Sequence, residues 1–183
     1  KKVLCIDMDP QANLTLLFGQ KSSACEEHLF HLLINSVKEL KLLHRPVLFS
    51  EVVRTQRGVD LLPAGEALSG FELTVAGITA PRQLILKRFI EKGNLREHYD
   101  FIVIDGPPTL GLLVVNILCA TDGVMVPFQP DQFSHKGILD FHQVVEAVGD
   151  MGIVRAPKVL GYIPNLTEPR RRQTAEETQR IEQ

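Results

Sequence analysis

The sequence lacks a run of about 18 consecutive apolar residues, so none of its segments predicts a membrane-spanning helix. It also shows no N-terminal signal peptide, which favours a cytosolic protein. Cysteine is scarce, and the three thiols, Cys5, Cys25 and Cys119, form no C-x-x-C pair. We therefore expect small buried cysteines in a reducing compartment, and neither a disulfide framework nor a cysteine zinc site.

The sequence has no large excess of charge of either sign, since its formal net charge is -2. Such a value excludes no class of partner, because a local basic patch is enough to bind nucleic acid. The G-x-S-x-G motif is absent, so Ser-His-Asp chemistry has no motif support. His28 and His31 share a predicted helix face, but no cysteine or carboxylate cluster completes a metal site, and we interpret this face as solvated.

Short apolar segments alternate along the chain with segments of helical periodicity. Five runs rich in valine, isoleucine and leucine lack clear in/out alternation, which predicts strands buried on both faces. These runs occupy residues 1–7, 58–64, 99–108, 122–128 and 158–165. The helical segments occupy residues 23–37, 80–93, 109–120, 134–149 and 174–183. The alternation predicts an α/β fold, with a mostly parallel sheet and helices on both faces, and 183 residues suit a single domain.

Local signals refine this pattern. Ser23 to Glu26 and Thr174 to Glu177 match the capping-box spacing, which predicts that the first and last helices begin there. Residues 64–80 are rich in glycine, alanine, serine and threonine, and we expect them to form a mobile connection.

Polar side chains stand at the ends of several predicted strands. Asp7 and Asp9 end the first strand, Asp105 ends "FIVID", and Asn165 follows "VLGYIP". Ligands bind beyond the carboxyl ends of strands in open α/β sheets, so we expect these distant residues to converge. Four apolar residues followed by an aspartate is how many nucleotide hydrolases present a carboxylate to Mg²⁺, and Gly106 lets the backbone approach a phosphate. The alternative is a strand that ends at an Asp-Gly turn without a chemical role.

Five blocks then follow one another along the chain: "IDMDPQANLT", "LLPAG", "YDFIVIDGPPTLGLLVVNIL", "VMVPFQPDQFSHKGI" and "VLGYIPN". In this order they resemble the ParA/MinD-type partitioning ATPases, deviant P-loop NTPases that segregate plasmids and chromosomes. The resemblance runs from residue 1 to about residue 172, and the "DPQ" and "DGPP" turns favour the ParA branch. It implies a Rossmann-like, three-layer P-loop NTPase fold that binds ATP and Mg²⁺.

The resemblance also implies roles for individual residues. Asp9 matches the aspartate that orients the attacking water, and in-line attack on the γ-phosphate needs little covalent help from the protein. Asp7 matches the aspartate near the Mg²⁺ shell, and Asp105 the Walker B aspartate, so both are candidate metal residues. Asn165 matches the asparagine that reads the adenine edge, and Pro127 precedes the region that contributes to the base pocket and the dimer face.

Two switch segments carry over in the same way. The first matches Gln11, Ala12, Asn13 and Thr15, and the second matches Gly106, Pro107, Pro108 and Thr109. Among these residues, Asn13, Gly106 and Pro107 are the candidates for contact with the nucleotide. Both segments would respond to the γ-phosphate.

One part of the family pattern is missing. The family's phosphate-binding loop, K-G-G-x-G-K-[ST], lies upstream of the "VLCIDMDPQ" strand, and no G-x-x-x-x-G-K-[ST] occurs in the 183 residues. We therefore expect a fragment that lacks the P-loop strand and helix at its N-terminus and is also cut at its C-terminus. The alternative is a shortened paralogue. On either interpretation we expect the 183 residues alone to be inactive as an ATPase.

The resemblance implies partners as well: an ATP-bound homodimer, non-specific DNA, a ParB-like centromere-binding adaptor that stimulates hydrolysis, no membrane, and a cytoplasmic, nucleoid-associated location. Arg170, Arg171 and Arg172 form the only dense basic cluster and are candidate DNA contacts, although a solvated basic turn explains them equally simply. Two other functions stay open. One is a related positioning ATPase for a cargo other than DNA, and the other is a non-catalytic interaction module of the same fold.

Overall fold

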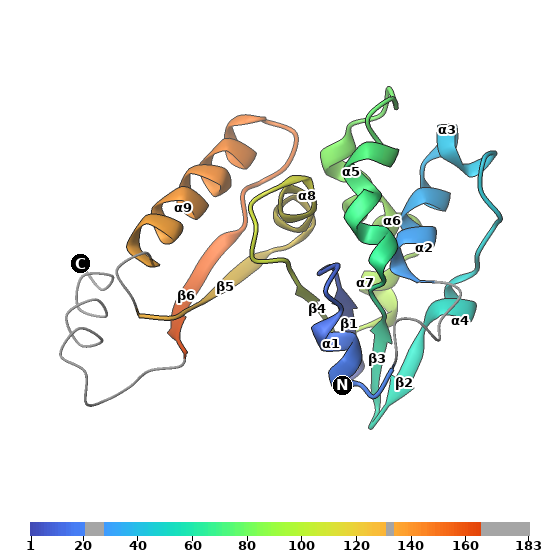
Figure 1. Ribbon diagram of the computed structural model, residues 1–183, viewed down its shortest axis with the longest axis horizontal. Helices are drawn as coiled ribbons and strands as arrows, with labels where there is room; N and C mark the ends of the chain where they lie inside the picture. Colours follow the sequence, from blue (N-terminus) through green and yellow to red (C-terminus); the bar gives the residue numbers. More distant parts are fainter. Residues whose placement is uncertain (21–27, 131–133, 166–183) are drawn as a thin grey trace. The chain divides into compact units, whose positions relative to one another are not determined.

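The computed structural model describes residues 1–20, 28–130 and 134–165. The chain divides into two compact units, Lys1–Ala120 and Thr121–Gln183, and each has a sheet of its own (Figure 1). The single domain expected from the length stays a prediction.

The sheet of the first unit has four strands in the order β2-β3-β1-β4. Its strands are β1 (Val3–Asp7), β2 (Arg54–Gln56), β3 (Val59–Leu62) and β4 (Phe101–Asp105). Strand β1 pairs in parallel with β3 and with β4, and only the β2–β3 pair is antiparallel. The predicted α/β fold with a mostly parallel sheet is therefore confirmed.

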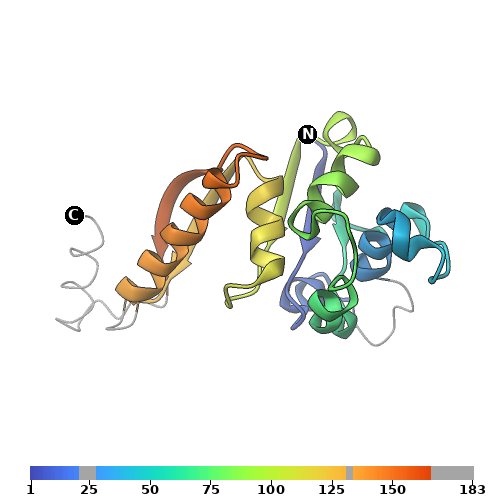
Figure 2. The same ribbon diagram turned by 90° about the horizontal axis from the view of Figure 1, so that it is seen from above.

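Short helices pack against this sheet in the first unit, which Figure 2 shows from above. They are α1 (Asn13–Leu17), α2 (Leu29–Ser36), α3 (Lys38–Lys41), α4 (Phe49–Val52), η2 (Glu66–Gly70), α5 (Phe71–Thr74), η3 (Arg82–Leu84), α6 (Ile85–Lys92), α7 (Leu95–His98) and α8 (Leu112–Ala120). One buried cluster joins Leu4 and Ile6 of β1 to Leu33 of α2, Phe89 of α6 and Ile117 of α8. Burial of these side chains contributes about 1.5–3 kcal/mol each and holds the helices on the face of the sheet to which Leu4 and Ile6 point.

The opposite face of β4 is more open. Phe101 and Val103 project from it and are 51% and 53% exposed. In the parallel register they lie beside Val3 and Cys5, which are half-buried. Cys119 is buried as expected, and neither Cys5 nor Cys119 forms a disulfide.

The second unit contains β5 (Gly123–Phe128), α9 (Ser134–Asp150) and β6 (Lys158–Pro164). Strands β5 and β6 are parallel, with an irregularity in register after Val124. Helix α9 lies where the sequence predicts a helical segment, at residues 134–149, and it buries Ile138, Val145 and Val148. His142 of α9 hydrogen-bonds to the hydroxyl of Tyr162 on β6, which ties the helix to the strand.

Several local expectations turn out differently. Residues 64–80 contain η2 and α5, and Leu68, Phe71 and Val75 within this segment are buried to 1% exposure or less. The solvated-face interpretation is wrong for His28, which is 9% exposed and packs against Gly65. A Cβ atom at Gly65 would lie 2.7 Å from the imidazole, so a glycine makes this packing possible.

Two predicted helix starts lie outside the described residues, namely the capping boxes at Ser23 and Thr174. The described part of the first predicted helix begins at Leu29, where the His28 amide donates a hydrogen bond to Nδ1 of His31 at 3.1 Å. Within the described parts of the chain, no helix combines the length and the apolar character that crossing a membrane requires.

Candidate functional site

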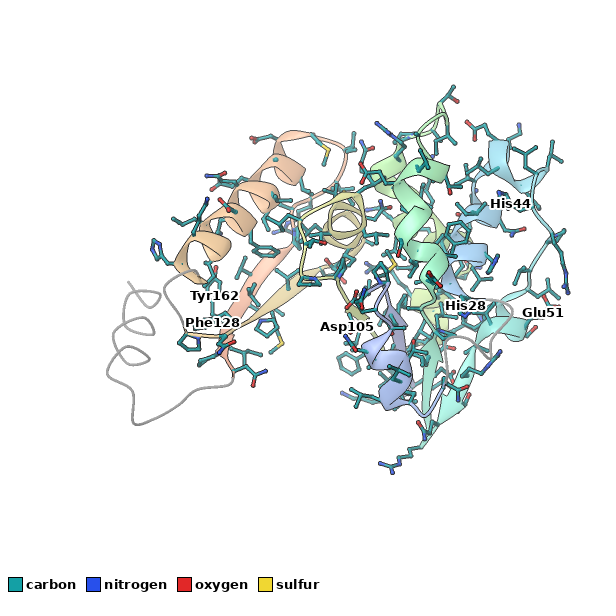
Figure 3. All side chains as sticks on the ribbon, viewed as in Figure 1. His28, His44, Glu51, Asp105, Phe128 and Tyr162 are labelled. Carbon is teal, nitrogen blue, oxygen red and sulfur yellow. The ribbon has the colours of Figure 1, made fainter. Side chains whose placement is uncertain are left out.

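The carboxyl ends of β1 and β4 meet, as the strand-end rule predicts. The parallel register places Asp7 beside Asp105, and the amide of Met8 donates a hydrogen bond to the carbonyl oxygen of Asp105 at 2.8 Å. Figure 3 labels Asp105 at this end of β4. Two acidic side chains almost 100 positions apart in the sequence are thus neighbours at one edge of the sheet.

A tight turn after β1 carries Asp9. The Asp9 carboxylate accepts a hydrogen bond from the amide of Gln11 at 3.0 Å, and the carbonyl oxygen of Asp9 accepts one from the amide of Ala12 at 2.9 Å. Ala12 adopts a left-handed conformation with φ of 56°, which is uncommon outside glycine and lets the chain enter α1 at once. Asp9 is 8% exposed, whereas Asn13, the first residue of α1, is exposed.

Asp7 lies wholly within the protein and is held by three hydrogen bonds. Oδ1 accepts one from the Asp9 amide at 3.1 Å, and Oδ2 accepts two from Thr15, from its amide at 2.8 Å and from its hydroxyl at 2.7 Å. Burial raises the pKa of Asp7, and the hydrogen bonds from Thr15 and Asp9 oppose this rise by stabilising the carboxylate. The sequence-based candidacy of Asp7 as a metal residue remains a proposal.

Asp105 has different surroundings. Its side chain is exposed, and within the described parts of the chain its carboxylate accepts no hydrogen bond. Partial burial raises the pKa of Asp105, and the negative charges of Asp7 and Asp9 raise it further. A cation bound here would relieve that repulsion. Because the Asp105 side chain is exposed, it is the most available of the three carboxylates for binding a cation.

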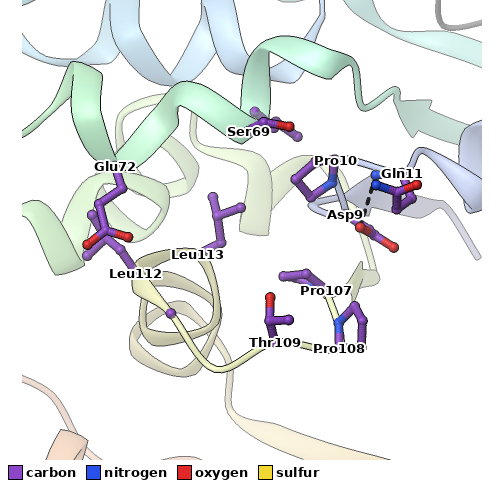
Figure 4. Close-up of a pocket in the computed structure, with 12 residues that line it drawn as sticks. Asp9, Pro10, Gln11, Ser69, Glu72, Pro107, Pro108, Thr109, Leu112 and Leu113 are labelled. Carbon is purple, nitrogen blue, oxygen red and sulfur yellow. Dashed lines mark hydrogen bonds between the residues drawn. The ribbon is translucent and has the colours of Figure 1, made fainter.

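A pocket of about 360 Å³ opens beside Asp9 (Figure 4). Its lining comes from the turn after β1, from η2 and α5, and from the loop between β4 and α8 together with the start of α8. The lining residues are Asp9, Pro10, Gln11, Leu68, Ser69, Glu72, Pro107, Pro108, Thr109, Gly111, Leu112 and Leu113. Both segments expected to act as switches therefore border one cavity.

Gly106 and Pro107 begin the loop after β4. A Cβ atom at Gly106 would lie 2.9 Å from Cδ1 of Ile117, the free end of a side chain that can shift. Packing therefore does not by itself require glycine at this position, and the expected close approach of a phosphate remains a proposal. Pro107 is half-buried and lines the pocket.

The two candidates for the base pocket lie in the second unit. Pro127 is in β5, where it pairs in register with Ile163 of β6. Asn165 directly follows β6, and its amide donates a hydrogen bond to the carbonyl oxygen of Phe128 at 2.7 Å. Pro127 and Asn165 are thus close together at the carboxyl ends of the two strands, and both are exposed (Figure 3 labels Phe128).

The donor set fits Mg²⁺ only in part. Across residues 1–20, 28–130 and 134–165, no group of three or more His, Cys, Asp or Glu side chains is arranged to hold a metal ion. Mg²⁺ commonly takes only one or two carboxylates from a protein and completes its shell with water and substrate phosphates. The Asp105 carboxylate, with no hydrogen bond of its own, fits that pattern as a single ligand.

The structure adds residues that sequence reasoning did not assign. Ala64 donates a hydrogen bond to the hydroxyl of Thr15, which in turn bonds to Asp7, and Leu68, Ser69 and Glu72 line the pocket. The "LLPAG" block, which contains Ala64, is part of the family resemblance, but its residue types do not predict which side chains it contacts. The candidate DNA contacts Arg170, Arg171 and Arg172 lie outside the described residues.

Comparison with known proteins identifies a family and several proteins that are similar to this chain. A family model described as an AAA domain (AAA_31) matches residues 1–154. The sporulation initiation inhibitor protein Soj of Bacillus subtilis is 31% identical over 148 residues, which cover 81% of this chain and 54% of that protein. The chromosome partitioning protein ParA of Caulobacter vibrioides is 32% identical over 148 residues, which cover 81% of this chain and 52% of that protein.

A solved structure agrees with this relationship. Cobyrinic acid a,c-diamide synthase from Mycobacterium smegmatis, with bound ADP and magnesium, superposes with a TM-score of 0.82 at 30% identity. The superposition covers 99% of this chain and 68% of that one. The chain spans about half the length of the curated relatives above. Because the family model matches from residue 1, its match gives no support to the expected loss of an N-terminal segment.

Proposed function

The chain belongs to the AAA-domain family of ParA- and Soj-like P-loop ATPases, and we propose that it supplies the water-orienting and magnesium-binding half of an ATPase that partitions DNA. The observation that carries this proposal is the meeting of Asp7 and Asp105 at neighbouring strand ends, with Asp9 near enough for its charge to raise the pKa of Asp105. Asp9 also lines a pocket that both proposed switch segments border. Membership of an ATPase family gives the carboxylates at these strand ends a chemical role, namely ATP hydrolysis.

In the proposed mechanism, the residues act by position and charge. Asp9, fixed by the turn to Gln11, accepts a hydrogen bond from a water molecule and aims it at the γ-phosphate. A carboxylate is a weak base at neutral pH, so Asp9 orients the water and does not fully remove its proton. Asp105 holds Mg²⁺, with Asp7 beside it, and bound Mg²⁺ would neutralise charge on the phosphates. Asn13, Gly106 and Pro107 are the proposed nucleotide contacts of the first unit. Pro127 and Asn165 of the second unit are proposed separately, from the resemblance, as contacts to an adenine base.

The phosphate cradle is proposed to come from outside these 183 residues. No G-x-x-x-x-G-K-[ST] motif occurs among them, and within the described residues β4 pairs with β1 alone. The exposed Phe101 and Val103 give this edge strand an apolar surface, which edge strands of monomeric proteins usually avoid. These features support a further segment that covers β4.

The cellular role is proposed by similarity. The names of the relatives refer to chromosome partitioning and to sporulation. The resemblance to partitioning ATPases adds the rest of the proposal: an ATP-dependent homodimer that binds non-specific DNA and responds to a ParB-like adaptor. Arg170, Arg171 and Arg172 are the proposed DNA contacts, and the proposed location is the cytoplasm, at the nucleoid. A cargo other than DNA remains the alternative for the same chemistry.

The test is ATP hydrolysis by the protein joined to an upstream G-x-x-x-x-G-K-[ST] segment. Asp9→Ala is expected to slow magnesium-dependent turnover by about 100-fold or more while nucleotide binding weakens far less. Asp100→Asn, at the opposite end of β4, is the control and should leave both unchanged. If Asp9→Ala reduces binding and turnover equally, Asp9 is structural. If the unaltered protein binds ATP without hydrolysing it, the chain is a non-catalytic module.

A further inference from the structure

We propose that Thr15 is a positioning residue whose hydroxyl fastens the Asp9 turn to the end of β3. The proposal concerns the interior of the site, where Thr15 is 0% exposed. Its catalytic consequence rests on the function proposed above, whereas its structural consequence does not.

The Thr15 hydroxyl joins two elements that are far apart in the sequence. It donates a hydrogen bond to Oδ2 of Asp7 at 2.7 Å and accepts one from the amide of Ala64 at 2.9 Å. A hydroxyl has one proton to donate, and here that proton goes to the carboxylate while a lone pair serves the amide. The hydroxyl of Thr15 therefore uses both its donor and an acceptor position in these two hydrogen bonds.

The same bonds continue to Asp9. Oδ1 of Asp7 accepts the amide hydrogen of Asp9 at 3.1 Å, so a continuous series runs from Ala64 through Thr15 and Asp7 to Asp9. All four residues are at most 8% exposed, and hydrogen bonds in such surroundings are strong and costly to break. The position of Asp9 is therefore coupled to the end of β3.

The other end of this series leads to the facing wall of the pocket. Ala64 is followed directly by Gly65 and η2, and η2 contributes Leu68 and Ser69 to the cavity that Asp9 also lines. One hydroxyl thus fastens the turn that carries Asp9 to the segment opposite it. A side chain that faced a phosphate could not make both bonds, so the structure assigns Thr15 an inward role within the first switch segment.

Thr15→Val separates this role from simple packing. Valine keeps the branched shape and volume but removes the hydroxyl, which leaves the buried Ala64 amide without its partner. Thr15→Ser keeps the hydroxyl and loses only a methyl group. Thr74→Val is a matched control, because the Thr74 hydroxyl bonds only to the carbonyl oxygen of Gly70, within its own helical segment.

The first measurement is amide hydrogen exchange in the 183-residue protein. Ala64 lies just beyond the last residue of β3, and its amide is expected to be protected in the unaltered protein because Thr15 accepts from it. Thr15→Val should speed exchange at Ala64 and Asp9 by about tenfold or more, whereas Thr15→Ser and Thr74→Val should not. Rapid exchange of the Ala64 amide in the unaltered protein would overturn the proposal, even if Thr15→Val does not fold.

The second measurement is turnover in the protein joined to a G-x-x-x-x-G-K-[ST] segment. Thr15→Val should lower kcat by about 10- to 100-fold, because a small displacement of Asp9 is costly, with KM for ATP little changed. Thr15→Ser should restore most of the activity. An unchanged kcat in Thr15→Val, beside an active unaltered protein, contradicts the positioning role. If the unaltered protein is inactive but the exchange result holds, the proposed function fails and the fastening stands.

Discussion

At the residue scale, three aspartates that are close in space have different surroundings. Asp7 is fully buried and accepts three hydrogen bonds, while Asp9 is nearly buried and lines a pocket. Asp105 is exposed, and its carboxylate accepts no hydrogen bond within the described part of the protein. The three carboxyl groups therefore differ in environment and not in residue type: Asp9 is placed for the proposed water-orienting role, Asp105 is the most open to a cation, and both oxygens of Asp7 already accept hydrogen bonds.

Asp105 should reduce the stability of the protein at neutral pH. Burial and the charges of Asp7 and Asp9 raise its pKa above the ordinary 3.8, so the folded state binds this proton more tightly than the unfolded state. The stability linked to Asp105 is therefore complete below about pH 3.8 and is lost as the pH rises through the raised pKa. Asp105→Asn, which cannot ionise, should unfold at a higher urea concentration than the unaltered protein at pH 7.

The gap in urea midpoint should close as the pH falls below about 3.8, where the Asp105 carboxyl group is neutral in both the folded and the unfolded state. Asp100→Asn, at the amino end of the same strand, should show no such pH-dependent gain. Equal midpoints at pH 7, or a gap that widens on acidification, contradict the proposed repulsion. A gain in stability on loss of Asp105 is what a functional carboxylate predicts, since sites of this kind commonly reduce stability.

The sequence could predict which carboxylates meet, but not what each one contacts. Asp7 and Asp105 follow from strand ends, a rule that depends only on topology. The inward role of Thr15 does not follow, because a residue in the first turns of a short helix can face either way, and its partner Ala64 is 49 positions away. For the same reason, the burial of His28 against Gly65 was hidden in the sequence.

At the element scale, α8 is held by a polar side chain within an otherwise apolar helix. Asn116 is fully buried, and its Oδ1 accepts the amide hydrogen of Leu86 at 3.1 Å. Its Nδ2 donates to the carbonyl oxygens of Arg82 and Leu112 at 3.0 and 2.9 Å. The bond to Leu86 satisfies a backbone amide in the first turn of α6 that the helix itself leaves without a partner. Asn116 therefore sets how α6 packs on α8.

Asn116→Ala is expected to destabilise the protein by about 2–4 kcal/mol, because it leaves the buried Leu86 amide without its partner, removes the bond to the Arg82 carbonyl group and opens a small cavity. Urea unfolding followed by far-ultraviolet circular dichroism measures the change. Asn94→Ala, at an exposed position before α7, serves as the control and should cost much less. A loss below about 0.5 kcal/mol for Asn116→Ala would show that water or local rearrangement replaces these bonds.

Long, strongly patterned elements were predictable, and short ones were not. The segments that became β1, β3, β4, β5, β6 and α9 stand out because their hydrophobic patterns continue over several residues. Helices α3, α4 and α5 have four residues each and form because tertiary packing buries Leu40, Val52 and Phe71. Tertiary contacts of this kind leave no periodic trace in the sequence, which is why residues 64–80 resembled a loose connection.

At the scale of the whole molecule, the proposed function assigns the chain one part of a nucleotide-hydrolysing site. The family relationship explains the sheet, the strand-end carboxylates and the two switch segments. The motif that cradles phosphates in P-loop enzymes is absent from the 183 residues, and within the described residues β4 has a strand on one side alone. We propose that the absent motif and the unpaired side of β4 have one cause, namely that activity requires a phosphate-binding segment packed beside β4.

The most direct test compares magnesium-dependent ATP hydrolysis by the 183-residue protein with hydrolysis by the same protein joined to an upstream G-x-x-x-x-G-K-[ST] segment. We expect no measurable turnover from the first protein. We expect turnover from the second, and Asp9→Ala should abolish it. Magnesium-dependent hydrolysis by the 183 residues alone, lost on Asp9→Ala, would contradict the account, because the site would then be complete without the added loop.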